Sequence, residues 1–170
     1  MTDPKGFYAA LRDFRDAVQS ISGAYVVIVG GLAVQEHGYA RWTEDIGAIA
    51  DSAHFSELIE RLREKGFELT PQKILKHRAT GIELDLLREG TQLSGARGAL
   101  PPPQELGSNL GFAHLNGLIR LKLLANRVED QADVSRLLKA HPGEWARIRA
   151  NLPVEFQADF DRIAEDAQAR

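Results

Sequence analysis

The chain has 170 residues, of which 44% are hydrophobic and 26% charged, and its formal net charge is −3. This composition is typical of a globular protein with a core of its own, and it gives no reason to expect strong non-specific binding to nucleic acid. The absence of cysteine excludes disulfides, thiolate nucleophiles and cysteine-based zinc sites. No apolar run approaches the roughly 20 residues that span a bilayer, and the N-terminus lacks the apolar core of a signal peptide. We therefore expect a cytoplasmic protein that does not enter a membrane.

The first half of the chain predicts alternating helices and strands. Apolar residues recur at spacings of three and four from Phe7 to Ile21, which predicts a helix that begins at Pro4. Residues 25–29 carry no charge and are mostly β-branched, which predicts a buried strand. Two glycines interrupt that strand before a short helix. The further elements expected in this half are a helix over 55–62 and strands at 45–50, 67–69, 74–78 and 82–87.

The second half predicts helices after a long irregular segment. Residues 88–111 are rich in glycine and contain three consecutive prolines, which predicts a loop, with a short strand near 93–100 as an alternative. From His114 onward the apolar spacing predicts four helices, the third started by Pro142 and the fourth by Pro153. We therefore predict an α/β (α+β) fold, with an α/β core over 1–110 and a helical region over 111–170. The helical region packs on the core, either as a separate unit or within one single domain.

The segment from Gly30 to Asp51 carries the clearest functional signal. It reads GGLAVQEHGYARWTEDIGAIAD, which is a Gly-Gly turn, a short helix and a strand that opens with an acid. This order resembles the core of the small bacterial nucleotidyltransferases with the polymerase-beta-like fold, the group of the minimal nucleotidyltransferases and abortive-infection toxins. Their pattern is Gly-Gly followed by Asp-x-Asp. Here the strand begins Asp45-Ile46-Gly47, so the second acid is missing.

The resemblance covers residues 26–138 and implies a mixed sheet with flanking helices, a C-terminal helical bundle and a nucleotide cleft between them. It implies transfer of NMP from a magnesium-bound NTP to an RNA, a protein or a small-molecule acceptor. In this reading Asp45 and Asp85 bind Mg²⁺, and position 47 is where the second acid belongs. The residues implied in phosphate binding are Gly30, Gly31, Arg41, Thr43 and Lys122.

The missing acid predicts a damaged metal site. Magnesium binds oxygen ligands, usually carboxylates and phosphates, and two aspartates at i and i+2 on a strand face the same way. No neighbour of Gly47 is a convincing substitute, because Asp51 is too far along the strand and Glu44 faces away, while Glu83 would approach from another angle. We expect transfer to be impaired or absent, whether Gly47 is natural or engineered, and the enzymatic status stays open. The alternative is a degenerate, non-catalytic binding module (a pseudoenzyme), as in a toxin-antitoxin-like system with an antitoxin-like partner.

Each candidate residue also has an ordinary structural interpretation. Asp85 alone is typical of an edge-strand acid facing water, and Gly30-Gly31 of a plain tight turn. Lys122 lies on an apolar helix face, where a lysine usually keeps its ammonium in water. Residues Arg127, Asp130 and Asp133 match a stretch of the resembling family, for which we expect a structural role; the two acids are alternatively surface residues of a first helical turn. The basic cluster of Lys73, Lys76, His77 and Arg78 is interpreted as a solvated edge strand rather than an RNA contact.

Overall fold

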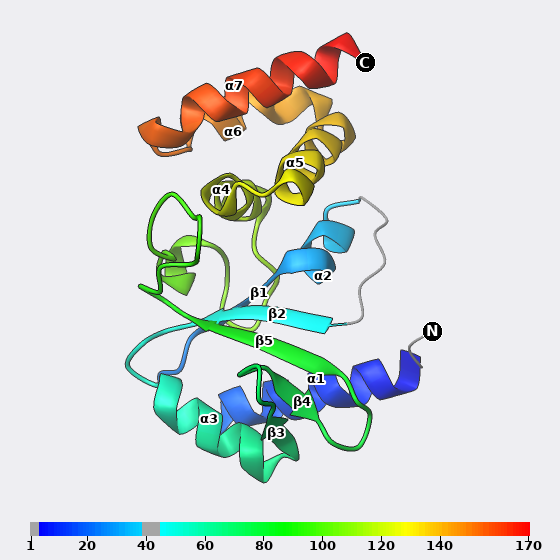
Figure 1. Cartoon of the computed structure of the whole chain (residues 1–170), viewed down its shortest axis with the longest axis vertical. Coiled ribbons are helices and arrows are strands. Elements are labelled where there is room, and N and C mark those ends of the chain that lie inside the picture. The colour runs from blue at the N-terminus through cyan, green and yellow to red at the C-terminus, as the bar shows by residue number, and fades with distance from the viewer. Residues whose placement is uncertain (1–3, 39–44) are drawn as a thin grey trace.

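A five-stranded mixed sheet forms the centre of the protein, which we describe from a computed structural model over residues 4–38 and 45–170 (Figure 1). Its strands lie in the order β1-β2-β5-β4-β3. Strands β2 and β5 pair in parallel, and the other neighbours pair antiparallel. The strands are β1 (Val26–Val29), β2 (Asp45–Ala50), β3 (Phe67–Leu69), β4 (Leu75–His77) and β5 (Glu83–Arg88).

Helices cover both faces of this sheet. Helices α1 (Pro4–Gln19) and α3 (Phe55–Glu64) lie on one face. Helix α2 (Gly30–Glu36) lies on the other face, on the side of the C-terminal helices (Figure 1). Those helices are α4 (Leu115–Ala125), α5 (Val128–Ala140), α6 (Trp145–Ala150) and α7 (Val154–Ala169), with 3₁₀ turns at η1 (Pro103–Glu105) and η2 (Pro142–Glu144). The predicted α/β class, a mixed sheet with flanking helices followed by a helical bundle, is confirmed.

The alternation of strand side chains divides the core into two hydrophobic clusters. Val26 and Ile28 of β1 pack with α1 and α3, whereas Val27 and Val29 pack with α2 and the C-terminal helices. All four residues are buried, which explains why β1 reads as a continuous apolar run. Because the second cluster holds residues of the sheet and of α4 to α7, the helical region packs directly on the α/β core.

Residues 88–111 connect the sheet to the helical region. The alternative of a short strand near 93–100 is not found; the structure has an isolated β-bridge between Gln92 and Ala99 in this segment. The Arg97 amide donates to the Leu124 carbonyl at the end of α4, 2.9 Å away, and the Arg97 side chain pairs with Asp159 of α7. These contacts fix the segment against two helices, so it is part of the packed structure.

Residues 110–113 then run beside the outer edge of β1. The Leu110 amide donates to the Val26 carbonyl at 2.7 Å, and the Ala113 amide donates to the Ile28 carbonyl at 2.8 Å. The Ile28 amide donates in return to the Gly111 carbonyl at 2.9 Å. Thus β1 is hydrogen-bonded on both sides.

The basic cluster does not form an edge strand, so that interpretation is wrong. Strand β4 lies between β3 and β5, and His77 within it is buried. The imidazole of His77 contacts Asp13 of α1 at 2.8 Å and Thr80 at 2.7 Å. Within the described ranges, no helix has both the length and the apolar character needed to cross a membrane.

Candidate functional site

The parallel pairing of β2 and β5 gathers acidic residues on one face of the sheet. Asp45 is the register partner of Glu83, and Gly47 is the register partner of Asp85. The intervening residues Ile46 and Leu84 pack toward α1 and α3. Because alternate strand residues face opposite ways, the acids and Gly47 face α2 and the C-terminal helices. The two predicted metal-binding residues therefore lie on the same face, on adjacent strands.

The charges on this face act on one another. The partial burial of the Asp85 carboxyl raises its pKa above the ordinary value, although the residue still has accessible surface, and repulsion from Asp45 and Glu83 raises the pKa further. The positive charge of Arg127 acts in the opposite direction and lowers the pKa. Asp85 is exposed at the surface, but β5 is the central strand of the sheet, so the edge-strand interpretation of this residue is wrong.

Position 47 has room for a side chain. Its backbone does not adopt the left-handed conformation that favours glycine. A Cβ placed there would lie 3.4 Å from the Val29 carbonyl oxygen and 3.6 Å from Val29 Cγ2, which are ordinary contact distances. Neither the local backbone conformation nor the packing around it requires a glycine at this position.

The Gly-Gly pair opens α2 directly after β1, two residues earlier than the sequence predicts. Gly30 has a φ of +72°, a conformation that L side chains rarely adopt, and no atom lies within 4 Å of a Cβ built there. This geometry accounts for the glycine as a turn residue. Of the other predicted phosphate-binding residues, Arg41 and Thr43 lie outside the described residues.

Lys122 is buried in an ion-pair network that joins α4 to α5. Its ammonium nitrogen lies 3.3 Å from Asp130 Oδ1 and 2.9 Å from Asp133 Oδ2. All three residues are at most 8% exposed. The expectation that the Lys122 ammonium stays in water is therefore wrong, and so is the alternative that the two aspartates are surface acids. The predicted structural role of the aspartates agrees with this arrangement.

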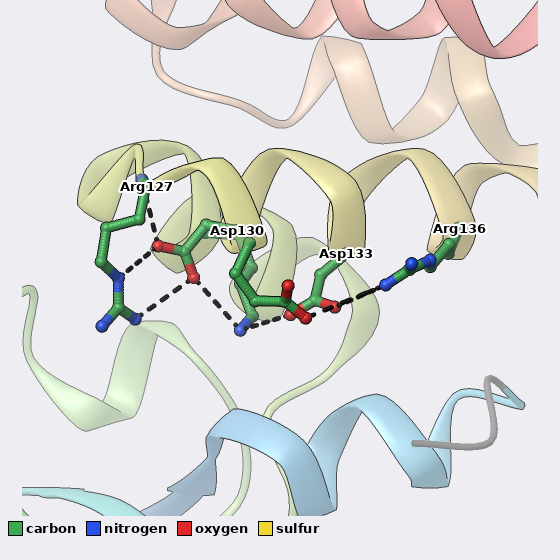
Figure 2. A network of polar contacts seen from close by, with 6 residues as sticks. Arg127, Asp130, Asp133 and Arg136 are labelled. Carbon is green, nitrogen blue, oxygen red and sulfur yellow. Dashed lines mark hydrogen bonds and ion pairs between the residues drawn. The ribbon is translucent and has the colours of Figure 1, made fainter. Parts of the chain in front are cut away.

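Two arginines extend the network to the surface: Arg127 directly before the first turn of α5, and Arg136 within the helix (Figure 2). Arg127 Nε donates to Asp130 Oδ2 at 2.7 Å, and a terminal nitrogen of Arg127 donates to Asp130 Oδ1 at 3.3 Å. Arg136 lies 3.9 Å from Asp133. Burial alone would raise the pKa of Asp130, but the hydrogen bond from Arg127 and the charge of Lys122 outweigh it and lower the pKa.

Arg127 is the residue of this region whose place sequence reasoning missed. It precedes α5 as its N-cap residue, and its amide is bound by the Asp130 carboxylate at 3.2 Å. Its side chain is 76% exposed, yet its charge acts on Asp85 of the sheet. No spacing rule links residue 127 to a strand about forty residues earlier, so the sequence held no signal for this proximity.

The residues present fit one magnesium ion better than two. Among the described residues, no group of three or more His, Cys, Asp or Glu side chains is arranged to hold a metal ion. Two carboxylates, with phosphate oxygens and water as remaining ligands, match the usual environment of Mg²⁺. The negative charge of Asp45 raises the pKa of Asp85, and a cation bound by both carboxylates would oppose that effect. A pair of ions needs a bridging ligand, and Gly47 supplies none.

Two other groups of polar contacts join segments that lie far apart in the sequence. Asp51, at the end of β2, accepts hydrogen bonds from the Tyr25 amide at 2.8 Å and from His54 Nδ1 at 2.6 Å. His37 Nε2 contacts the Ala113 carbonyl, and His141 Nε2 contacts the His37 carbonyl, each at 2.7 Å. These contacts tie α2 to the start of α4 and to the end of α5.

Comparison with known proteins gives a limited result. No known family profile matches the chain, and no curated protein matches it significantly. Its fold is similar to the solution structure of the antibiotic-resistance factor ANT(2'')-Ia, with a TM-score of 0.45 and 14% sequence identity. The similarity covers 96% of this chain and 88% of that chain. A similarity of this strength does not establish what this chain binds or does.

Proposed function

We propose that this protein is a nucleotidyltransferase-fold protein that binds a magnesium-bound NTP on the acidic face of β2 and β5. In this proposal Asp45 and Asp85 hold the cation, and the nucleotide lies between the sheet and the C-terminal helices. The acceptor of the NMP group is an RNA, a protein or a small molecule. Transfer is impaired because Gly47 lacks the carboxylate that would complete the metal site.

One observation carries the proposal: the register places Asp45, Gly47 and Asp85 on a single sheet face. The resembling family needs its Asp-x-Asp pair and its third acid in this relation. Magnesium would neutralise the negative charge of the phosphates there. Catalysis of phosphoryl transfer depends mainly on this neutralisation and on the positioning of the reactants. The remaining acid, Glu83, is the register partner of Asp45.

The second candidate is a non-catalytic module that keeps the fold and binds a protein, for example an antitoxin-like partner. Gly47 is the observation that favours it, because glycine offers no metal ligand at a position where the surroundings would accommodate a side chain. In this candidate the purified chain is folded but has no affinity for a magnesium-bound nucleotide.

Titration separates the two candidates. Mg-ATP and Mg-GTP are titrated into the purified chain by calorimetry, with and without magnesium. Micromolar, magnesium-dependent binding that is lost in Asp85→Asn supports the nucleotide site. A folded chain that binds neither nucleotide in any condition contradicts the first candidate and favours the second.

A restoration experiment tests the metal site itself. Gly47→Asp should raise the melting temperature in the presence of magnesium relative to its absence, and should increase magnesium-dependent transfer of α-³²P label from an NTP to RNA or to the protein. The matched control is Gly47→Asn, which has the same size and no charge. Equal behaviour of the two variants in both readouts would show that position 47 does not belong to a metal site.

A further inference from the structure

We propose that Arg127 is a phosphate-binding residue of this site, and that it contacts the polyphosphate of the nucleotide from the helical side, opposite the carboxylates of the sheet. The inference rests on the proposed function, because it assigns a contact within the same site. The lysine implied by the family resemblance, Lys122, then has a supporting role.

The first step of the argument concerns Lys122. Its ammonium is shared between Asp130 and Asp133 and is buried, so its hydrogen-bonding capacity is directed into the protein. Binding a phosphate would require it to leave two carboxylates that are themselves buried. Leaving a buried charge unpaired is costly, so the pairing opposes such a movement.

The second step concerns the exposure of Arg127. Its guanidinium is held at Nε and at one terminal nitrogen by Asp130. Within the part of the chain that the structure describes, its second terminal nitrogen makes no hydrogen bond. The group is therefore oriented by a buried carboxylate while most of its surface remains accessible, at 76%. An arginine held in this way loses little conformational entropy when it binds an anion.

The third step concerns direction. Figure 2 shows the Arg127 side chain leaving the start of α5 on the side of the chain where α2 lies. The negative charge of Asp85 is one of the causes that raise the pKa of Arg127, so the guanidinium lies within electrostatic range of that acid. Arg136, nine positions further along α5, lies about 13 Å away at 1.5 Å per residue. Among the described residues, Arg127 is the member of the network whose pKa the charge of Asp85 raises.

The fourth step concerns the ligand. A nucleoside triphosphate carries several negative charges, and the sheet contributes the acids Asp45, Glu83 and Asp85 to the same face. A cation held by carboxylates satisfies some phosphate oxygens, and the others need a positive donor. The planar fork of an arginine matches phosphate oxygens, and such charge-assisted hydrogen bonds are about twice as strong as neutral ones.

The experiment compares Arg127→Gln with the matched control Arg136→Gln, which removes the same charge from the far end of the network. Affinities for Mg-ATP and for magnesium tripolyphosphate, which has no base, are measured in the full chain. We expect Arg127→Gln to weaken both about ten- to a hundredfold, the usual range for a charge-assisted hydrogen bond. We expect Arg136→Gln to change neither, and Arg127→Lys to retain part of the affinity.

The outcomes are distinguishable from failure of the proposed function. Magnesium-independent binding of tripolyphosphate that Arg127→Gln weakens would support the arginine contact while contradicting the magnesium site. Magnesium-dependent binding that Arg127→Gln leaves unchanged would overturn the inference and keep the proposed function. Absence of binding of either probe to the unsubstituted chain would overturn both. Thermal unfolding of both glutamine variants shows whether a loss of binding reflects a loss of fold.

Discussion

Gly47 of β2 and Asp85 of β5 are register partners in the parallel pair at the centre of the sheet. Their side-chain positions face the same way, toward the C-terminal helices. The predicted third acid thus lies beside the position where the resembling family has its second acid. This relationship makes position 47 the most informative place to change the chain.

Removing the charge of Asp85 should stabilise the protein in the absence of magnesium. Burial and the repulsion from Asp45 raise the folded-state pKa of Asp85 above its unfolded value. An acid with a raised pKa destabilises the folded state at pH values above that pKa, where its carboxylate is ionised. Asp85→Asn should therefore increase the free energy of unfolding at pH 7, by less than about 1 kcal/mol because solvent screens the exposed group.

Chemical unfolding at pH 7 and at pH 3.5 checks this prediction. The gain from Asp85→Asn should shrink at the lower pH, where the native carboxyl is protonated. Glu68→Gln, on the edge strand β3, is a control that removes one negative charge elsewhere. A loss of stability in Asp85→Asn at pH 7 would show that Asp85 is held by favourable contacts instead.

Removing Lys122 should be strongly destabilising. Lys122→Met leaves Asp130 and Asp133 buried without their common cation. Breaking a buried pair by removing one partner costs about 3–5 kcal/mol. Urea unfolding should show this loss, whereas Lys139→Met, at an exposed position of α5, should change stability little.

A combined variant separates charge from packing at the same network. Lys122→Met together with Asp130→Asn and Asp133→Asn removes all three buried charges. It should recover part of the stability lost in the single variant, since no buried carboxylate is then left uncompensated. If the combined variant is less stable than Lys122→Met alone, the loss does not arise from unpaired charge.

Gly117 in α4 should not tolerate a side chain. A Cβ at this position would lie 2.5 Å from the Leu106 carbonyl oxygen and 2.9 Å from Leu106 Cα, which are backbone atoms of the turn after η1. Gly117→Ala should cost about 1–3 kcal/mol, the usual range for overpacking, and thermal unfolding measures it. Gly98→Ala is the control, because nothing lies within 4 Å of a Cβ there.

Stability should fall in acid partly through Asp51. Its burial would raise the pKa, but the hydrogen bonds from the Tyr25 amide and from His54 lower it below the ordinary value. A lowered folded-state pKa contributes stability that is present above the unfolded value of about 3.9 and is lost as the pH falls through the folded one. Asp51→Asn should therefore be less stable at pH 7 and lose less on acidification than the unsubstituted chain. Unfolding curves from pH 7 to pH 2 test this, with the exposed Asp166→Asn as control.

The local elements were largely predictable because they depend on short-range patterns. The apolar stripe of α1 and the charge-free run of β1 identify a helix and a buried strand without any tertiary information. The placement of Asp45, Gly47 and Asp85 on one face followed from the period of a strand once the two strands pair. The pairing itself came from resemblance, since nothing in residues 45–50 specifies a partner at 83–88.

The predictions that failed depend on contacts between distant segments. His77 looked solvated because its neighbours are basic, but its partner Asp13 lies 64 positions earlier, on α1. The environment of Lys122 was predicted from the residues that share its helix face, whereas its partners Asp130 and Asp133 belong to the next helix. Helical periodicity describes which residues share a face and does not describe what that face meets.

The segment that runs beside β1 also affects whether two copies of this protein can pair through the edges of their sheets. Residues 110–113 already occupy the outer hydrogen-bonding groups of that strand, so another chain has little backbone to pair with there. The opposite border of the sheet is β3, which is only three residues long and carries the charged Glu68. Short, charged borders resist intermolecular strand addition. Fibril-like stacking through this sheet is therefore disfavoured, and concentrated solutions should remain free of cross-β aggregates while the fold is intact.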